Sequence, residues 1–130
     1  MGTRQVSCAT IVFNPQGRLL FGYKLEYQKW ELPGGKLHGF ETVKHCACRE
    51  LHEETGILET SLKYLGYYDG DREWLTHMFT CVTIDEPRVM EPDKHSDWVW
   101  HSLDYLPTMI PACADALTLY LREAKALVCK

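Results

Sequence analysis

The sequence contains no apolar run near the roughly 20 residues that a helix needs to cross a bilayer. Residues 1–7 also lack the basic-then-apolar pattern of a signal peptide, so we expect a cytoplasmic location. Positive charge is in the minority, because 14 Lys and Arg stand against 18 Asp and Glu, for a net charge of −4. We therefore expect neither a membrane partner nor a nucleic-acid polymer. A polyanionic ligand would need local cations or a metal ion.

The six cysteines form no Cys-x-x-Cys pair, and a chain of 130 residues can bury a core without disulfides. We therefore expect reduced thiols. One alternative is a zinc site built from His45, Cys46, Cys48 and His52. On a helix, however, Cys46 and Cys48 would point about 200° apart. Buried, inert thiols are the favoured interpretation.

Length and composition predict one globular domain over residues 1–130, since 45% of the residues are hydrophobic and 25% are charged. Segments rich in β-forming residues are bounded by turn residues, and no internal repeat interrupts them. Strands are expected over residues 6–13, 18–25, 30–32, 62–68, 74–84 and 98–103. The Pro33-Gly34-Gly35 run predicts a tight loop in which regular structure pauses.

Two helices are expected, over residues 42–55 and 112–127. Gly56 follows the first one as a C-terminal cap. The second carries an apolar stripe of Cys113, Ala116, Leu117, Tyr120, Leu121 and Ala124. Strands interspersed with helices predict an α/β domain in which helices cover a mixed sheet.

The helix over residues 42–55 changes character along one face. Its first turns present an apolar arc that includes Val43, and two turns later Glu50, Glu53 and Glu54 fall on nearly the same line. Carboxylates at this spacing repel one another, and partial burial makes their ionisation more costly. A hard cation such as Mg²⁺ or Mn²⁺ would gather them. The alternative is a solvated helix face that pairs with Arg49 and Lys44.

The preceding loop favours a phosphate site over the solvated face. Gly34 and Gly35 allow the backbone to approach a ligand closely, and a helix N-terminus offers free N–H groups to anions. The complete pattern is Gly35, five residues, Glu41, seven residues, Arg49-Glu50-Leu51, one residue, Glu53-Glu54, one residue, Gly56-Ile57. This pattern resembles the Nudix box over residues 35–57, and the chain resembles Nudix hydrolases of the MutT type.

The resemblance implies a Nudix-type α/β/α sandwich with a mixed β-sheet. It also implies a divalent cation, Mg²⁺ or Mn²⁺, bound by Glu50, Glu53, Glu54 and the Gly34 carbonyl, with Glu53 or Glu54 accepting the proton of the attacking water. Arg49 and Glu41 would support these catalytic groups. A further metal ligand often comes from a later loop, where Glu91, Asp93 and Asp97 are equal candidates. The chain departs from many relatives at His38, which removes any role for an acid there.

Residues 91–103 resemble those of MutT-type diphosphatases, which implies hydrolysis of an NTP or dNTP, modified bases included, to a monophosphate and pyrophosphate. Trp98 or Trp100 would stack on the base and Thr76 or His77 would contact its edge, although simple core packing is the alternative for each Trp. Lys24 aligns with a basic position that often contacts phosphate in relatives, and Gly35 is a further candidate for substrate binding. Arg18 and Arg72 are the other candidate cations.

Other functions stay open from the sequence alone. The same centre could cleave a dinucleoside polyphosphate, a nucleotide sugar or capped RNA, or the domain could sense a nucleotide without turnover. A sensing module is expected to have lost a box carboxylate, whereas this chain retains all of them. This favours an enzyme that acts on a small-molecule nucleotide. Either a monomer or a homodimer is compatible with the sequence.

Overall fold

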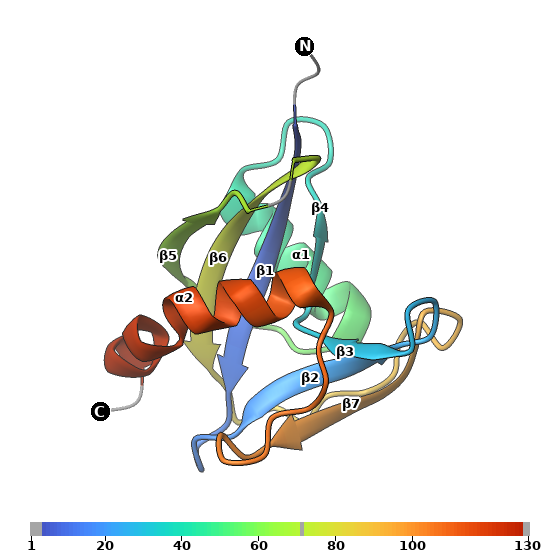
Figure 1. The fold of residues 1–130 in the computed structure, drawn as a ribbon, viewed down its shortest axis with the longest axis vertical. Helices are drawn as coiled ribbons and strands as arrows, with labels where there is room; N and C mark the ends of the chain where they lie inside the picture. Colours follow the sequence, from blue (N-terminus) through green and yellow to red (C-terminus); the bar gives the residue numbers. More distant parts are fainter. Residues whose placement is uncertain (1–3, 71, 129–130) are drawn as a thin grey trace.

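The computed structural model describes residues 4–70 and 72–128. These residues form seven strands and two helices, which Figure 1 labels in chain order. The elements are β1 (Gln5–Phe13), β2 (Leu19–Lys24), β3 (Lys29–Glu31), β4 (Gly34–Lys36), α1 (Val43–Thr55), β5 (Lys63–Tyr68), β6 (Trp74–Val82), β7 (His95–His101) and α2 (Pro111–Val128).

All seven strands belong to one mixed sheet. The main path runs β3-β2-β1-β6-β5, while β4 pairs with β1 and β7 pairs with β2. The β1–β6 pair is parallel over its whole length, from Gln5 opposite Trp74 to Phe13 opposite Val82, and the other pairs are antiparallel. The predicted mixed sheet is therefore confirmed.

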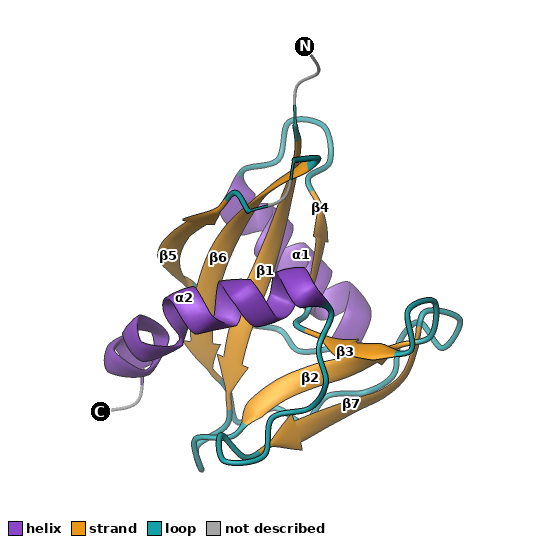
Figure 2. Cartoon of the chain, viewed as in Figure 1, coloured by secondary structure: helices purple, strands orange, loops and turns teal. Residues whose placement is uncertain are grey.

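The two helices cover opposite faces of the sheet. Figure 2 shows α2 in front of the strands and α1 behind them. One buried cluster includes Cys46, Ala47 and Leu51 of α1, and a second includes Leu117 and Ala124 of α2. The three layers confirm the α/β/α sandwich, while one domain over residues 1–130 stays a prediction.

The helix signals act as expected. The Thr42 hydroxyl accepts a hydrogen bond of 3.1 Å from the His45 N–H, which satisfies a donor at the start of α1. Gly56 ends α1 in the left-handed region, with φ of 77°. The predicted stripe of α2 packs into the second cluster.

The prediction of a loop at Pro33-Gly34-Gly35 is wrong for its last two residues. Gly34 and Gly35 belong to β4, where they pair with Ala9 and Cys8 of β1, and neither has a positive φ. The absence of side chains serves close approach instead. A Cβ on Gly34 would collide with the Cys8 carbonyl and lie 2.8 Å from the Ala9 Cα. These glycines let β4 lie against β1 and under α1.

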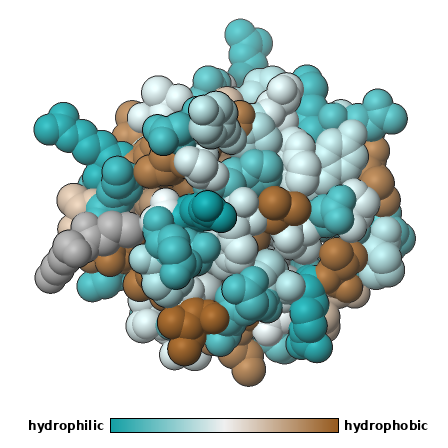
Figure 3. All heavy atoms as spheres, turned by 90° about the horizontal axis from the view of Figure 1, so that it is seen from below, coloured by the Kyte–Doolittle hydropathy of each residue, from teal (hydrophilic) through white to brown (hydrophobic). Residues whose placement is uncertain are grey.

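The predictions about the cysteines and about membrane-spanning segments can be compared with the structure for the described residues. Cys8, Cys46, Cys48, Cys81 and Cys113 are free thiols, whereas Cys129 lies outside the described residues, as does Asp71 of the β5–β6 connection. Neither helix in residues 4–70 and 72–128 has the length and apolar character to cross a membrane. On the face shown in Figure 3, apolar residues are scattered among polar ones.

Candidate active site

The acidic end of α1 lies against the glycine strand β4. The backbone N–H of Gly34 donates a hydrogen bond of 2.8 Å to Oε1 of Glu54. Glu50 lies over Gly35, because a Cβ built there would be 2.6 Å from both of its carboxylate oxygens. Two of the three glutamates predicted to bind metal therefore converge on the Gly34-Gly35 backbone.

Arg49 joins the third glutamate to this group. Its Nη1 lies 2.8 Å from Oε1 of Glu50 and 2.6 Å from Oε1 of Glu53, so one guanidinium nitrogen holds both carboxylates. The same guanidinium donates through Nε and Nη2 to the two oxygens of Glu41, at 2.9 and 2.7 Å, and through Nη2 to the Lys36 carbonyl. Arg49 thus ties the box to β4.

The electrostatics of the carboxylates differ strongly. Burial raises the pKa of Glu54 well above its usual range, and the Gly34 N–H only partly offsets this effect. Burial also raises the pKa of Glu50, and the charges of Glu53 and Glu91 add to that shift. Hydrogen bonds from Arg49 lower the pKa of Glu41 to about 2. Arg49 thus stabilises Glu41 as an anion, whereas Glu50 and Glu54 would be stabilised as anions by a further cation.

This donor set fits a divalent cation. Glu50 and Glu54 offer carboxylate oxygens beside a backbone that can approach a ligand, and the side chain of Glu53 is 43% exposed at their edge. Such hard oxygen donors with an open side suit Mg²⁺ or Mn²⁺, which retain waters and take substrate phosphates as further ligands. The Gly34 carbonyl, Glu50, Glu53 and Glu54 are the groups that would hold the ion.

Of the three candidates for a later ligand, the structure favours Glu91. Glu91 is half-buried and its charge contributes to the raised pKa of Glu50, so the two carboxylates are neighbours. Asp93 and Asp97 are exposed. Lys94 forms an ion pair of 3.4 Å with Glu91, which places one cation at the edge of this cluster.

A second group of polar side chains was not predicted from the sequence. Nε2 of His95 lies 2.7 Å from Oε2 of Glu31 and 3.8 Å from Oε2 of Glu54. Glu31 in turn forms an ion pair of 3.6 Å with Lys24. These residues come from β7, β3, α1 and β2, so no spacing along the chain could have revealed them. Among the described residues, the one group of three potential ligands whose atoms all lie within 4.8 Å of one another is Glu31, Glu54 and His95. Neither Glu50, Glu53 and Glu54 together nor the cysteine–histidine set forms such a group, so the three box glutamates are gathered less closely than the sequence predicts.

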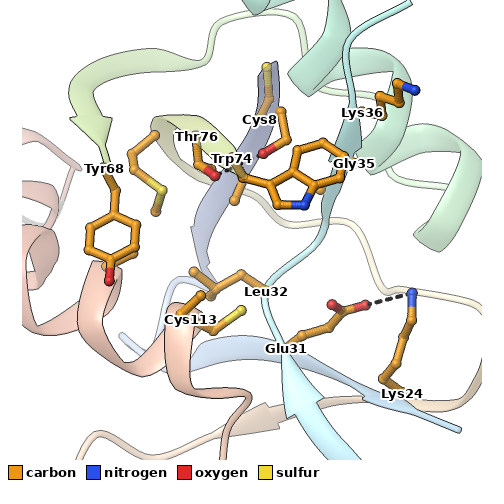
Figure 4. A pocket seen from close by; sticks show the side chains of 16 residues that line it. Cys8, Lys24, Glu31, Leu32, Gly35, Lys36, Tyr68, Trp74, Thr76 and Cys113 are labelled. Carbon is orange, nitrogen blue, oxygen red and sulfur yellow. Dashed lines mark hydrogen bonds and ion pairs between the residues drawn. The ribbon is translucent and has the colours of Figure 1, made fainter. Parts of the chain in front are cut away.

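A pocket of about 250 Å³ opens on the α2 side of the sheet. It is lined by parts of β1, β4, β6 and the first turns of α2, and Figure 4 shows its labelled side chains. Lys24, Thr76, Gly34 and Gly35 all line it, as does Glu31. The glycine strand therefore has the pocket on one side and the box carboxylates on the other.

The structure does not support base stacking by Trp98 or Trp100, because neither lines this pocket. Trp98 is 8% exposed, belongs to the core cluster under α1, and has its ring against Gly22. Trp100 packs against the same cluster and donates to Glu86. Core packing, the alternative for both, is what the structure shows.

The aromatic walls of the pocket are Trp74 and Tyr68. Figure 4 shows the indole of Trp74 beside Gly35 and the Tyr68 ring on the opposite side. Trp74 was not predicted from the sequence. Its place opposite Gln5 depends on the register of the parallel β1–β6 pair, which only the fold reveals.

Of the remaining residues predicted to contact the substrate, some lie near the pocket and others lie far from it. His77 follows Thr76 along β6 and so points to the opposite face, where its Nδ1 lies 2.8 Å from the Tyr64 hydroxyl. Arg18 is exposed in the β1–β2 turn, beyond the end of β1 that is remote from the pocket. Arg72 lines an adjoining cavity that shares Tyr68 and Ala112 with this pocket.

The layered fold and the carboxylates gathered at a glycine strand define the chain as an α/β/α protein whose acidic site suits a divalent cation and a phosphate ligand. The family model described as NUDIX domain matches residues 3–120. The chain belongs to this family, and it is a Nudix phosphoanhydride hydrolase.

Individual relatives agree with this assignment. The crystal structure of a MutT NUDIX hydrolase from Burkholderia pseudomallei is 31% identical, covers 90% of this chain and 98% of its own, and superposes with a TM-score of 0.82. An RNA pyrophosphohydrolase of Bartonella henselae is 28% identical over 80% of this chain and 79% of its own length. The MutT protein of Methanosarcina mazei, 24% identical with a TM-score of 0.79 over 94% of this chain and 96% of its own, shows the shared fold.

Proposed function

We propose that the chain hydrolyses a nucleoside triphosphate, either NTP or dNTP, to the monophosphate and pyrophosphate with Mg²⁺ as the metal. The observation that carries this proposal is the position of the Gly34-Gly35 strand between the pocket and the box carboxylates. If the base and sugar of a nucleotide lie in the pocket, its phosphates would extend across the Gly34-Gly35 backbone to Glu50 and Glu54. A side chain at Gly35 would meet the Glu50 carboxylate, whereas one at Gly34 would meet the backbone of β1.

The pocket has the groups that a nucleoside needs. Trp74 and Tyr68 supply aromatic surface, and Thr76 and Ser7 supply hydroxyls that share a hydrogen bond of 2.8 Å. Lys24 places a cation at the wall, where it can contact phosphate. This arrangement suits one base rather than a polymer, and a small-molecule nucleotide is therefore the proposed substrate.

The residues of the box divide the chemistry among them. A bound divalent cation would supply charge neutralisation at the phosphate oxygens and a more acidic water nucleophile. Arg49 keeps Glu50 and Glu53 in place and is itself held by the Glu41 carboxylate. Glu53 or Glu54 accepts the proton of the attacking water. Glu53 is the more exposed of the two and is open to solvent, whereas Glu54 is fixed by Gly34.

A second candidate substrate is the triphosphorylated 5′ end of RNA. The relative from Bartonella henselae is named an RNA pyrophosphohydrolase, and its similarity covers most of both chains. The cleaved bond would be of the same kind, and only the first nucleotide would occupy the pocket. The net charge of −4 gives no general attraction for the rest of an RNA strand, so the mononucleotide stays the first choice.

The test is a substrate panel of NTPs, dNTPs, a nucleotide sugar, ADP-ribose and 5′-triphosphorylated RNA, with products separated by chromatography. We expect pyrophosphate and a monophosphate from a mononucleotide, in Mg²⁺ and not in EDTA. Glu53→Gln and Glu54→Gln should each lower kcat by about 100-fold or more, as loss of a metal ligand or general base does. Glu123→Gln, an exposed glutamate of α2, is the matched control and should match the wild type. Full turnover in EDTA would refute the proposal.

A further inference from the structure

We infer that His95 is a positioning residue that holds the pocket carboxylate Glu31 and the box carboxylate Glu54 in one arrangement, so that pocket and metal site are built together. The inference deepens the proposed function and rests on it for the role of Glu54 as a metal ligand. The evidence is the place of one imidazole nitrogen between two acids from different elements.

One imidazole nitrogen lies close to both carboxylates. His95 is fully buried in β7, and its Nε2 lies 2.7 Å from Glu31 Oε2 and 3.8 Å from Glu54 Oε2. The other oxygen of Glu54 already accepts from the Gly34 N–H. The Glu54 carboxyl group is therefore hydrogen-bonded to Gly34 through one oxygen, while its other oxygen lies 3.8 Å from His95, beyond hydrogen-bond distance.

The tautomer follows from hydrogen-bond accounting. Nδ1 of His95 is buried and has no hydrogen-bond partner among the described residues. A proton there would be an unsatisfied buried donor, whereas a proton on Nε2 reaches Glu31. The ring also packs against Trp98, since the two ring centroids lie 4.7 Å apart with their planes tilted by 46°. The Trp98 side chain thus holds the imidazole in place.

The network extends to the substrate side through Glu31. Glu31 lines the pocket and pairs with Lys24, another pocket residue. The sequence of contacts runs Lys24, Glu31, His95, Glu54, Gly34, and it begins and ends at the pocket wall. Removal of the imidazole would leave the Glu31 and Glu54 carboxylates facing each other, with Lys24 and the Gly34 N–H as their remaining partners. Their repulsion would displace Glu54 from the orientation it needs to bind the ion.

His95 could instead be a metal ligand, since its Nε2 and one oxygen from each acid lie within 4.8 Å of one another. The 2.7 Å separation from Glu31 is that of a direct hydrogen bond and leaves no room for an ion between those two atoms. The positioning role is therefore the one that the distances favour. Substitution by glutamine separates the two roles, because an amide can donate a hydrogen bond but is a poor replacement for an imidazole ligand.

The test measures Mn²⁺ binding to the full chain without nucleotide, from the electron paramagnetic resonance signal of free Mn²⁺. His95→Phe keeps a ring against Trp98 and removes the donor, and His95→Gln restores a donor. His101→Leu is the matched control, because His101 is in the same strand but its ring lies against Phe21 and Trp30. We expect His95→Phe to weaken Mn²⁺ binding by about 10- to 100-fold, as loss of a group that orients a metal ligand does. His95→Gln should recover most of the affinity and His101→Leu should retain it.

Three results would overturn the inference: unchanged Mn²⁺ affinity in His95→Phe, equal weakening in His101→Leu, or no recovery in His95→Gln. If His95→Phe does not fold, His95→Leu serves in its place, because it also removes the donor and leaves both Glu31 and Glu54, and it should weaken Mn²⁺ binding in the same way. This readout needs no substrate. A failure to hydrolyse any nucleotide would thus count against the proposed function alone.

Discussion

Gly35 and Glu50 occupy adjoining space that leaves no room for a side chain at position 35: a Cβ there would lie 2.6 Å from each Glu50 carboxylate oxygen. In Gly35→Ala the flexible end of Glu50 must move, while the backbone need not. We expect the free energy of unfolding to change little and the apparent Mg²⁺ affinity and kcat to fall by about 10-fold or more. Urea unfolding and a Mg²⁺ titration of activity measure the two effects. Normal Mg²⁺ dependence would show that Glu50 is not a ligand.

Gly34→Ala should behave differently, although it lies one residue away. Its Cβ would meet backbone atoms of Cys8 and Ala9, which cannot rotate away. We expect a loss of about 1–3 kcal/mol in the free energy of unfolding, as overpacking of a tight site causes. The urea midpoint of this variant, compared with that of Gly35→Ala, tests whether the missing side chain at position 34 serves packing against β1 and the missing one at position 35 leaves room for Glu50. Equal stability of the two variants would contradict this division.

The two tryptophans Trp74 and Trp98 should separate binding from stability. Trp74→Ala removes a wall of the pocket, and loss of a stacking contact of about 1–3 kcal/mol would raise KM for the nucleotide by about 10-fold or more. Trp98→Ala removes a buried core side chain and should lower stability by about 3–5 kcal/mol. Steady-state kinetics and urea unfolding measure these effects. A larger KM effect from Trp98→Phe, which keeps most of the core volume, than from Trp74→Phe would contradict the assignment.

The sequence predicted the elements well because their signals are local. Thr42 and Gly56 mark the ends of α1 by capping, and the apolar stripe of α2 identifies its buried face. The error at Gly34 and Gly35 has a physical cause, since glycine serves both turns and close packing of extended backbone. Only the partner strand decides between the two, and the Cys8 carbonyl lies far away in sequence.

The candidate site was predictable where its residues share one helix and not elsewhere. Arg49, Glu50, Glu53 and Glu54 have a fixed spacing that itself implies a common face. His95 and Trp74 reach the site through strand register, which a single sequence does not specify. Base stacking and core packing both stayed open for Trp98 because a buried aromatic and a stacking aromatic look alike in a sequence. Its place against Gly22 comes from the pairing of β2 with β7.

The pair Glu41 and Arg49 should make stability depend on acid pH. Arg49 lowers the pKa of Glu41 from 4.5 to about 2, so the ionised carboxyl group is favoured in the folded state. The resulting stability is fully present above pH 4.5 and is lost as the pH falls through about 2, because the unfolded chain binds the proton first. The pKa values of Glu50 and Glu54 are raised, so these two groups make stability depend on pH in the opposite direction. Their effect cancels when two proteins that both retain Glu50 and Glu54 are compared.

The comparison is therefore between the wild type and Glu41→Gln, by urea unfolding at a series of pH values from 7 downwards. We expect the wild type to be the more stable of the two at pH 7 and the difference to shrink below pH 4.5. In an Arg49→Lys background, the loss of stability caused by Glu41→Gln at pH 7 should be smaller than in the wild type. The reason is that an ammonium cannot reproduce the two guanidinium hydrogen bonds to Glu41. If the wild-type advantage stayed constant down to pH 3, the contribution of Glu41 to the free energy of unfolding would not depend on its charge. Arg49 would then orient the box through Glu50 and Glu53 alone.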